Sequence, residues 1–568
     1  MTMNDIDSKP SSSTSSTTVT TARRWLAADP DAATRTATEA LLATGGDALE
    51  AAFGSRLQFG TAGIRGTLGP GPGHLNRLLI RYVTAGLADY LLARVPNARE
   101  RGVVVGHDAR IGSPEFAAES VAVLTGAGFL VFNCPPESPT PLMAFALLQH
   151  GAAAAIVVTA SHNPPEYNGF KVYWENGAQI IPPHDHGIAL AIDAVIASGR
   201  DIPLGADVGT AITPGDAYLA AVTAQAARIP LPAGSPTVRV TYTPLHGVGA
   251  GLCEPAMTAE GAEVTTVAAQ RTPDGRFPTV RFPNPEEAGA MDMADRTALD
   301  TGAQLIIAND PDADRLAAGV VTSTGIRRFT GDELGALFAD ALLEARGREK
   351  NLAERAFVGR SLVSSELLTA IAGYYGADGI ETLTGFKWLW NSALDLIATG
   401  RTYVFAYEEA LGYSVGPVAR DKDGIGAAAT LIRIARQKPL IDRLYAIYAR
   451  HGYYGTRQKS VSDASNGGLA RLTARVSAIA AAPPATLSGL PVARVRDFTV
   501  PQDGLPATEG VGLWLADGTR VLVRPSGTEP KIKIYIQVVQ PWTGPETEAA
   551  TRFRIDALEA EVVALLKS

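Results

Sequence analysis

Residues 305–315 read LIIANDPDADR: an apolar run typical of a buried strand ends on three carboxylates at alternating positions, Asp310, Asp312 and Asp314. Neighbouring anions repel one another unless a cation neutralises them. Because no histidine or cysteine stands beside them, these hard oxygen ligands favour Mg²⁺ or Ca²⁺. A calcium EF-hand is excluded, since counting from Asp310 puts Arg315 where that motif needs glycine and Val321 where it needs glutamate. The alternative is a solvated acidic turn, but the apolar strand before the carboxylates favours a metal site.

Similar apolar, β-branched runs recur from about residue 59 onward and alternate with Ala- and Leu-rich helical stretches. This alternation predicts parallel α/β units, in which ligands bind at the carboxyl ends of the strands. The C-terminal part has closely spaced strand patterns before a closing helix, which predicts an antiparallel α+β domain. The expected strands are 102–106, 128–132, 155–159, 237–241, 263–267, 304–308, 356–359 and 402–406, then 492–498, 511–515, 519–523 and 531–538, before a helix over 549–566.

Composition excludes several classes of protein. The chain has 568 residues, enough for three to four domains, and 46% hydrophobic against 19% charged residues excludes a mainly disordered chain. A net charge of −8 gives no overall basic field for nucleic acid. The two cysteines, Cys134 and Cys253, form neither a disulfide framework nor a thiolate zinc site, so we expect a reduced, cytoplasmic setting. No apolar run is long enough for a membrane helix, and the Ser/Thr-rich residues 1–21 are expected to be a disordered tail.

A second candidate motif follows the strand expected at 155–159. Residues 158–165 read VTASHNPP, which places Ser161 at the carboxyl end of a strand, beside His162. A hydrolase nucleophile elbow needs glycine at 159 and 163, and this chain has threonine and asparagine there. Ser161 is a candidate nucleophile, whereas His162 has the alternative of satisfying a loop carbonyl.

Three more segments carry polar groups suited to a phosphorylated sugar. Residues 524–531 read RPSGTEPK, a turn whose arginine, hydroxyls, glycine and lysine can donate to a phosphate, although a polar hairpin is the commoner explanation of such a turn. Residues 59–66, FGTAGIRG, are glycine-rich and carry Arg65. Residues 407–413, YEEALGY, follow a strand. Glu408 or Glu409 either hydrogen-bonds sugar hydroxyls or is simply an exposed acid. Together these segments indicate phosphoryl transfer.

At these motifs the chain resembles the α-D-phosphohexomutases, the phosphoglucomutase and phosphomannomutase family. The similarity runs from about Trp25 to the C-terminus and is greatest to the branch that contains the phosphoglucomutase 2 type. Residues 159–164 look like the phosphoserine loop of the family, and residues 310–315 look like its magnesium loop. Residues 407–412 look like its sugar-binding loop, and residues 524–531 like its phosphate-binding loop.

The resemblance implies three related mixed α/β domains and a C-terminal α+β domain around a central cleft. The expected bounds are 22–205 for domain 1 with the phosphoserine loop, 206–325 for domain 2 with the magnesium loop, 326–450 for domain 3 with the sugar-binding loop, and 451–568 for domain 4 with the phosphate-binding loop. It further implies that Ser161 carries a phosphate, that Mg²⁺ is held by a phosphoserine oxygen together with Asp310, Asp312 and Asp314, and that glucose 1,6-bisphosphate is an activator.

By motif position, the resemblance assigns further residues. The candidates for catalysis beside Ser161 are Arg65, His162, Lys171 and Lys422, and the choice of acid and base among them stays open. The expected substrate-binding residues are Arg315, Thr384, Glu408, Arg524, Ser526, Gly527 and Thr528. One position departs from the family, because Ala410 stands where many members have serine, so one contact to a sugar hydroxyl is missing.

The function expected from the resemblance is a Mg²⁺-dependent phosphosugar mutase that interconverts glucose 1-phosphate and glucose 6-phosphate, with mannose phosphates second. A phosphopentomutase and a glucose-1,6-bisphosphate synthase are the alternatives. A non-catalytic phosphosugar-binding protein is disfavoured, because Ser161 and all three aspartates are present. We expect a small phosphosugar as partner, with no nucleic acid and no membrane, and a monomer or dimer.

Overall fold

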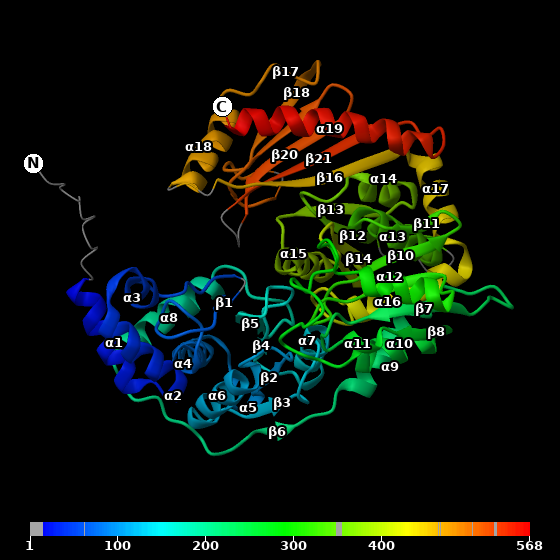
Figure 1. Cartoon of the computed structure of the whole chain (residues 1–568). Coiled ribbons are helices and arrows are strands. Elements are labelled where there is room, and N and C mark those ends of the chain that lie inside the picture. Colours follow the sequence, from blue (N-terminus) through cyan, green and yellow to red (C-terminus); the bar gives the residue numbers. More distant parts are fainter. Residues whose placement is uncertain are drawn as a thin grey trace, which may run out of the picture.

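The computed structural model describes residues 15–61, 63–347, 355–463, 465, 467–502, 504–526 and 531–567. Four β-sheets follow one another along the chain, each with its own helices. Figure 1 shows them as an arc: the first domain (blue to cyan) and the last (orange to red) lie at its two ends, and the second and third (green to yellow) join them. The prediction of three mixed α/β domains and a C-terminal α+β domain is confirmed.

The first sheet has strand order β1-β5-β4-β2-β3-β6, and its central strand β4 is buried along its whole length. Such a strand reads as a continuous apolar run because helices cover both of its faces. The strands are β1 Ile64–Thr67, β2 Val103–His107, β3 Val131–Asn133, β4 Ala154–Val158, β5 Tyr167–Trp174 and β6 Thr210–Ala211. The helices are α1 Ser16–Ala28, α2 Ala32–Thr44, α3 Gly46–Phe53, α4 Arg77–Arg94, α5 Ala98–Arg101, α6 Ser113–Gly126, α7 Thr140–His150 and α8 His184–Ser198.

The second and third sheets share one continuous apolar core, which includes Tyr242 of the second sheet and Tyr407 of the third. The second has strand order β11-β10-β9-β7-β8 and the third β13-β12-β14-β15. Their strands are β7 Val238–Thr243, β8 Ala262–Thr266, β9 Leu305–Ala308, β10 Ala317–Thr322, β11 Gly325–Arg328, β12 Ala356–Ser361, β13 Asp378–Thr382, β14 Thr402–Glu408 and β15 Gly412–Val415. Their helices are α9 Gly215–Ala226, α10 Ala250–Ala259, α11 Ala268–Arg271, α12 Asp292–Thr301, α13 Gly331–Gly347, α14 Leu367–Tyr374, α15 Phe386–Ala398, α16 Gly424–Gln437 and α17 Leu440–His451.

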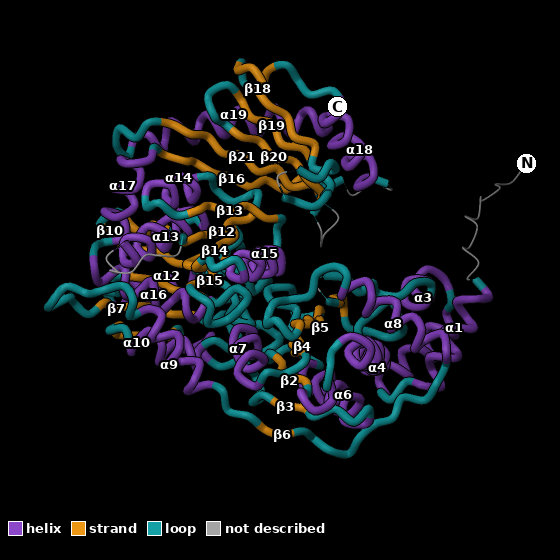
Figure 2. Tube along the Cα trace, turned by 180° about the vertical axis from the view of Figure 1, so that it is seen from behind, coloured by secondary structure: helices purple, strands orange, loops and turns teal. Residues whose placement is uncertain are grey.

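The fourth sheet is antiparallel, as predicted, and Figure 2 shows its strands side by side above the other domains. Its order is β16-β21-β20-β19-β18-β17. The elements are β16 Tyr453–Val461, α18 Gly468–Ala481, β17 Thr486–Leu487, β18 Leu490–Asp497, β19 Val511–Leu515, β20 Arg520–Pro525, β21 Ile532–Gln540 and α19 Glu546–Lys567.

One structural unit recurs in the first three sheets. A parallel strand (β4, β9 or β14) is followed by a loop and then by an antiparallel partner (β5, β10 or β15). Residues that the sequence marks for chemistry stand at or just after the end of each parallel strand: Ser161 after β4, Asp310 after β9 and Glu408 as the last residue of β14. The predicted parallel α/β pairings are present in these sheets, and the antiparallel partners β5, β10 and β15 make each sheet mixed.

Some predicted boundaries also differ. Helix α1 begins at Ser16, so residues 16–21 are helical rather than part of a disordered tail, and residues 1–14 lie outside the described ranges. The side chain of Ser15 accepts a hydrogen bond from the Thr17 N–H and caps this helix. Strand β6 pairs with β3, so the first sheet extends past residue 205. Strand β11 pairs with β10, so the second sheet extends past residue 325.

Candidate active site

Ser161 lies in the first residues after β4 in a left-handed backbone conformation, with φ of 53°. A residue other than glycine pays about 1–2 kcal/mol for this conformation. The backbone N–H of Ser161 donates to Thr159 Oγ1 at 2.8 Å, which helps to hold the turn. The Ser161 hydroxyl donates to Asp310 Oδ2 at 2.9 Å and lies 3.1 Å from His162 Nδ1. The predicted nucleophile of the first domain therefore touches the predicted metal loop of the second.

The three aspartates of that loop are buried, and one carboxylate oxygen from each lies within 4.8 Å of the others. The backbone N–H of Arg315 donates to Asp310 Oδ1 at 3.0 Å, and the Thr140 hydroxyl donates to Asp312 Oδ2 at 2.7 Å. A buried cluster of this charge requires cations around it.

Two lysines from other domains supply part of that positive charge. Lys171 on β5 of the first domain lies 2.9 Å from Asp312 Oδ2 and 3.1 Å from Asp314 Oδ2. Lys422, in the loop before α16 of the third domain, lies 3.0 Å from Asp314 Oδ2. Three domains thus meet at one cluster of charged groups.

The carboxyl groups differ in their preference for the charged form. Burial, together with the neighbouring Asp314 and Asp312, raises the pKa of Asp310 well above its usual range. Burial also opposes ionisation of Asp312, but Lys171 outweighs it and lowers the pKa of Asp312. Burial lowers the pKa of His162 well below its ordinary value, and Arg315 adds to this effect.

The donor set fits a hard divalent cation. The Oδ1 atoms of Asp312 and Asp314 are buried and have no hydrogen-bond partner, while the Oδ2 atoms of both residues contact lysine. Buried carboxylate oxygens without partners are costly unless a cation takes them. Oxygen-only ligands suit Mg²⁺, which keeps positions open for a phosphate. Asp310, Asp312 and Asp314, with an oxygen on Ser161, would hold such an ion.

Several of the predicted substrate residues make contacts within and between the second, third and fourth domains. The Arg315 guanidinium donates to the carbonyl of Ala410 at 3.0 Å and lies 3.6 Å from Glu286. The carboxylate of Glu408 accepts a hydrogen bond of 2.6 Å from the backbone N–H of Gly385. Arg524 of the fourth domain donates to the hydroxyl of Thr384, which links the predicted phosphate-binding loop to the third domain.

The other predicted residues are placed as follows. Arg65 on β1 donates to the side-chain oxygen of Asn163 at 3.1 Å, so it lies against the Ser161 loop. The backbone N–H of Ser526 donates to the carbonyl of Lys531 at 2.8 Å. Gly527 and Thr528 lie outside the described residues.

Sequence reasoning missed the residues that hold Lys422. Its neighbour Asp421 is buried, and Asp421 Oδ2 accepts hydrogen bonds from the Tyr173 hydroxyl and, at 3.0 Å, from the Gln179 side chain, both of the first domain. The lysine ammonium lies 3.4 Å from Asp421 Oδ1. These contacts join residues about 240 positions apart, and no local sequence signal marks them.

The buried glutamate next to Glu408 gives a prediction of pH dependence. Glu409 accepts hydrogen bonds from Ser364 at 2.9 Å and Ser361 at 3.2 Å, and burial, with the charge of Glu408, raises the pKa of Glu409 from 4.5 to about 7. Between these values the unfolded chain is ionised and the folded chain is not, so wild-type stability falls as pH rises from 4.5 to about 7 and then levels.

The uncharged Glu409→Gln variant lacks this loss. Its melting temperature relative to wild type should therefore be higher at pH 8 than at pH 5, measured by calorimetry at both. The exposed variant Glu546→Gln, at the start of α19, serves as the control. An equal difference between Glu409→Gln and wild type at the two pH values would contradict the assignment.

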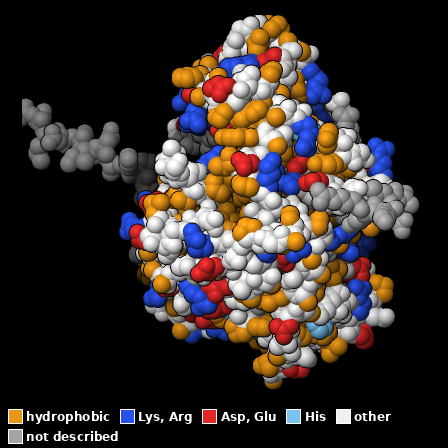
Figure 3. Space-filling model, turned by 90° about the vertical axis from the view of Figure 1, so that its right-hand side faces the viewer, with side chains coloured by type: hydrophobic (Ala, Val, Ile, Leu, Met, Phe, Trp, Pro, Cys, Tyr) orange, Lys and Arg blue, Asp and Glu red, His pale blue; other side chains and the backbone are white. Residues whose placement is uncertain are grey.

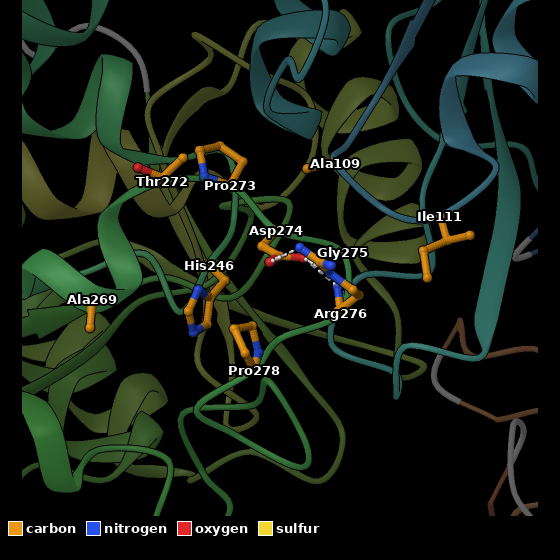
Figure 4. Close-up of a pocket in the computed structure, with 10 residues that line it drawn as sticks. All are labelled: Ala109, Ile111, His246, Ala269, Thr272, Pro273, Asp274, Gly275, Arg276 and Pro278. Atoms are coloured by element: carbon orange, nitrogen blue, oxygen red, sulfur yellow. Dashed lines mark hydrogen bonds and ion pairs between the residues drawn. The ribbon is translucent and has the colours of Figure 1, made fainter.

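Two cavities lie outside the charged cluster. One of about 570 Å³ lies between residues 109–111 of the first domain and residues 269–278 of the second, and Figure 4 shows His246, Asp274 and Arg276 at its wall. The other, of about 610 Å³, lies between α15 and residues 501, 502 and 504–506 of the fourth domain.

The molecular surface is mixed in character. On the face shown in Figure 3, the basic and acidic side chains that are described alternate, so no broad field of one sign covers it. Within the described residues, none of the helices combines the length and apolar character needed to cross a bilayer.

Comparison with known proteins identifies the family of the chain. The four domain models of phosphoglucomutase/phosphomannomutase match residues 56–197, 216–324, 330–451 and 471–541 in order. The chain therefore belongs to the phosphoglucomutase/phosphomannomutase family, whose members are isomerase-class phosphotransferases.

Among its relatives is the probable phosphoribomutase of Schizosaccharomyces pombe, which is 36% identical over 90% of this chain and 92% of its own length. The phosphopentomutase of Homo sapiens is 34% identical over 91% of both chains. The probable phosphomannomutase of Haemophilus influenzae is 36% identical over 81% of this chain and 92% of its own length. The crystal structure of a putative phosphomannomutase from Thermus thermophilus, at 23% identity, superposes with a TM-score of 0.67 over 90% of this chain and all of its own, and thus supports the fold.

Proposed function

We propose that this protein is a Mg²⁺-dependent phosphosugar mutase that moves a phosphoryl group between two positions of one sugar through phosphorylated Ser161. One observation carries the proposal: the Ser161 hydroxyl lies 2.9 Å from Asp310, a member of a buried cluster of three carboxylates. Lys171 on β5 and Lys422 in the loop before α16 contact the same cluster. Phosphoryl transfer needs little covalent chemistry from a protein beyond positioning and electrostatic stabilisation.

In the first half-reaction, the bond between phosphorus and Ser161 Oγ breaks while a free hydroxyl of the sugar phosphate forms the new bond, which gives a sugar bisphosphate. The bisphosphate turns over, and its other phosphate returns to Ser161. Arg315, Lys171 and Lys422 are the cations placed to neutralise the phosphoryl oxygens. Bound Mg²⁺ supplies further neutralisation of the charge on these oxygens. The sugar hydroxyl gives up a proton, and Ser161 Oγ takes one up as its bond to phosphorus breaks. Among the four acid–base candidates, His162 can accept a proton because its pKa lies well below the ordinary value, and Arg65, Lys171 and Lys422 carry protons and can donate.

For the substrate, we propose a hexose phosphate, with glucose 1-phosphate and glucose 6-phosphate first, mannose phosphates second, and glucose 1,6-bisphosphate as activator. A pentose phosphate is the third candidate. It is favoured by Ala410, which lacks the hydroxyl that many hexose-specific members place there, and by relatives named phosphoribomutase and phosphopentomutase. A further alternative is that the protein is a glucose 1,6-bisphosphate synthase, because the glucose 1,6-bisphosphate synthase of Mus musculus is 31% identical to this chain.

The test is a panel of 1-phosphates of glucose, mannose, N-acetylglucosamine and ribose, each with Mg²⁺ and with or without the matching bisphosphate. The ratio of kcat/KM values identifies the sugar. We expect turnover that the bisphosphate stimulates and a chelator abolishes. No turnover of any sugar, followed by bisphosphate release once a phosphoryl donor such as 1,3-bisphosphoglycerate is added, would replace the mutase by a synthase.

Replacement of the arginine at the start of the phosphate-binding loop tests that loop. Arg524→Ala should weaken phosphosugar binding by about 2–4 kcal/mol, because a desolvated dianion loses a charge-assisted donor. The dissociation constant is measured by calorimetry with a non-turning-over Ser161→Ala background. Arg457→Ala, on β16 of the same sheet and paired with Asp556 and Glu559, is the matched control. If Arg524→Ala and its parent bound the phosphosugar with equal affinity, the turn would be a polar hairpin with no part in phosphate binding.

A further inference from the structure

We propose that Arg110 is a positioning residue that holds the loop of Ser161 in its reactive conformation. This inference rests on the proposed function, since it concerns the phosphoryl transfer from Ser161. Arg110 lies outside every motif that the sequence marked for chemistry. It is 1% exposed, in the loop between β2 and α6.

The Arg110 guanidinium donates to four backbone carbonyls of the loop that carries Ser161. One terminal nitrogen, Nη2, lies 2.5 Å from the carbonyl oxygens of Ser161 and Asn163. The other, Nη1, lies 2.9 Å from the carbonyl of Pro164 and 3.1 Å from that of Tyr167. A planar fork of donors fits this arrangement, whereas the single ammonium of lysine does not.

The same guanidinium is itself held by a buried carboxylate. Arg110 Nε lies 3.3 Å from Asp108 Oδ2, and the Arg110 N–H donates to Asp108 Oδ1 at 3.0 Å. Asp108 Oδ2 also accepts from the Thr159 hydroxyl at 2.6 Å, and Thr159 Oγ1 in turn accepts from the Ser161 N–H. Thr159 therefore binds the N–H of Ser161 and Arg110 binds its C=O, and Asp108 holds both of these residues beside Ser161, which has a positive φ.

Residues of the second domain also pack against Arg110. The Phe277 ring lies against the guanidinium, with its centroid 5.0 Å from the Arg110 carbon Cζ. At Gly275 a side chain has no room, because a Cβ atom would meet the Ala109 carbonyl oxygen at 2.5 Å and Arg110 Cα at 2.7 Å. Figure 4 shows this loop beside Ala109 and Ile111. Arg110 thus contacts both the loop of Ser161 and the second domain, which carries the three aspartates.

Buried hydrogen bonds to carbonyls on both sides of Ser161 fix the direction of its side chain, and small displacements of a reacting atom reduce rate strongly. Arg110→Lys keeps the charge and loses the fork. We expect kcat to fall about 10²-fold with KM unchanged. The ³¹P resonance of the phosphoserine should shift or broaden as well, which a purely structural defect elsewhere would not cause.

Arg436→Lys is the matched control, because the Arg436 guanidinium also donates to three backbone carbonyls, those of Glu260, Pro236 and Ser235, between other elements. It should keep both kcat and the phosphoserine resonance. Wild-type kcat in Arg110→Lys, or a change confined to KM or melting temperature, would overturn the proposal. A wild-type chain that accepts no phosphate on Ser161 would overturn the proposed function instead.

A second pair of variants decides the matter if Arg110→Lys does not fold. Thr159→Val removes the hydroxyl that joins Asp108 to the Ser161 N–H, while Thr159→Ser keeps it. We expect a lowered kcat and an altered phosphoserine resonance in the valine variant and wild-type values in the serine variant. Equal kcat in the two variants would overturn the proposal.

Discussion

The Ser161→Ala variant is expected to lose turnover by about 10⁴-fold or more, because the nucleophile and phosphoryl carrier is removed. Its fold should be unchanged, since the residue stands in a loop after β4 and its hydroxyl contacts only Asp310 and His162 among the side chains described. The measurement is kcat for the preferred sugar phosphate together with the melting temperature.

A buried serine of the same domain provides the control for Ser161→Ala. The Ser120 hydroxyl donates to the Phe116 carbonyl within α6, so Ser120→Ala tests the loss of a buried hydroxyl without touching the charged cluster. This variant should retain activity. Wild-type rates in Ser161→Ala would exclude Ser161 as the phosphoryl carrier.

Asp312→Asn should weaken binding of Mg²⁺ and lower kcat by about 10²- to 10³-fold, since the variant keeps the shape of the side chain and loses its charge. Asp312 has one buried oxygen without a partner, and its other oxygen contacts Lys171 and Thr140. In the variant, Lys171 and Lys422 are balanced by one carboxylate fewer, so the site attracts a divalent cation less strongly.

Titration calorimetry with magnesium chloride alone measures this affinity without dependence on turnover. Asp193→Asn, at an exposed position of α8 paired with Arg56, is the control and should bind Mg²⁺ as the wild type does. Equal Mg²⁺ affinity of wild type and Asp312→Asn would place the metal elsewhere. A wild type that binds none would contradict the metal site altogether.

The loops of Ser161 and Asp310 were predictable because each follows a run of apolar, β-branched residues that the sequence marks as a buried strand. Strand β9 ends one residue before Asn309, and β4 ends just before Thr159, within a residue of the expected positions. The distances between these loops were not predictable from local pattern. Ser161 and Asp310 are 149 positions apart, and the contact between the first and second domains brings them together.

Several elements escaped prediction for identifiable reasons. Residues 16–21 contain serine and many threonines, which have low helix propensity, yet they form the start of α1 because Thr18 is buried and its hydroxyl donates to Glu50 of α3 at 2.8 Å. Strand β5 carries Lys171 and was not predicted, although its residues Phe170, Val172, Tyr173 and Trp174 are of types that favour strands and could have indicated it. Burial of Arg110 is likewise a tertiary property that its neighbours in sequence do not reveal.

The central claim is that Ser161 carries the phosphoryl group between the two halves of the reaction. The most direct test loads the protein with ³²P from labelled glucose 1,6-bisphosphate, locates the label by peptide mass spectrometry, and then chases with unlabelled glucose 1-phosphate or ribose 1-phosphate. We expect the label on Ser161 and its transfer to the sugar at a rate no slower than kcat. A label on another residue, or a label on Ser161 that leaves more slowly than turnover, would contradict the account.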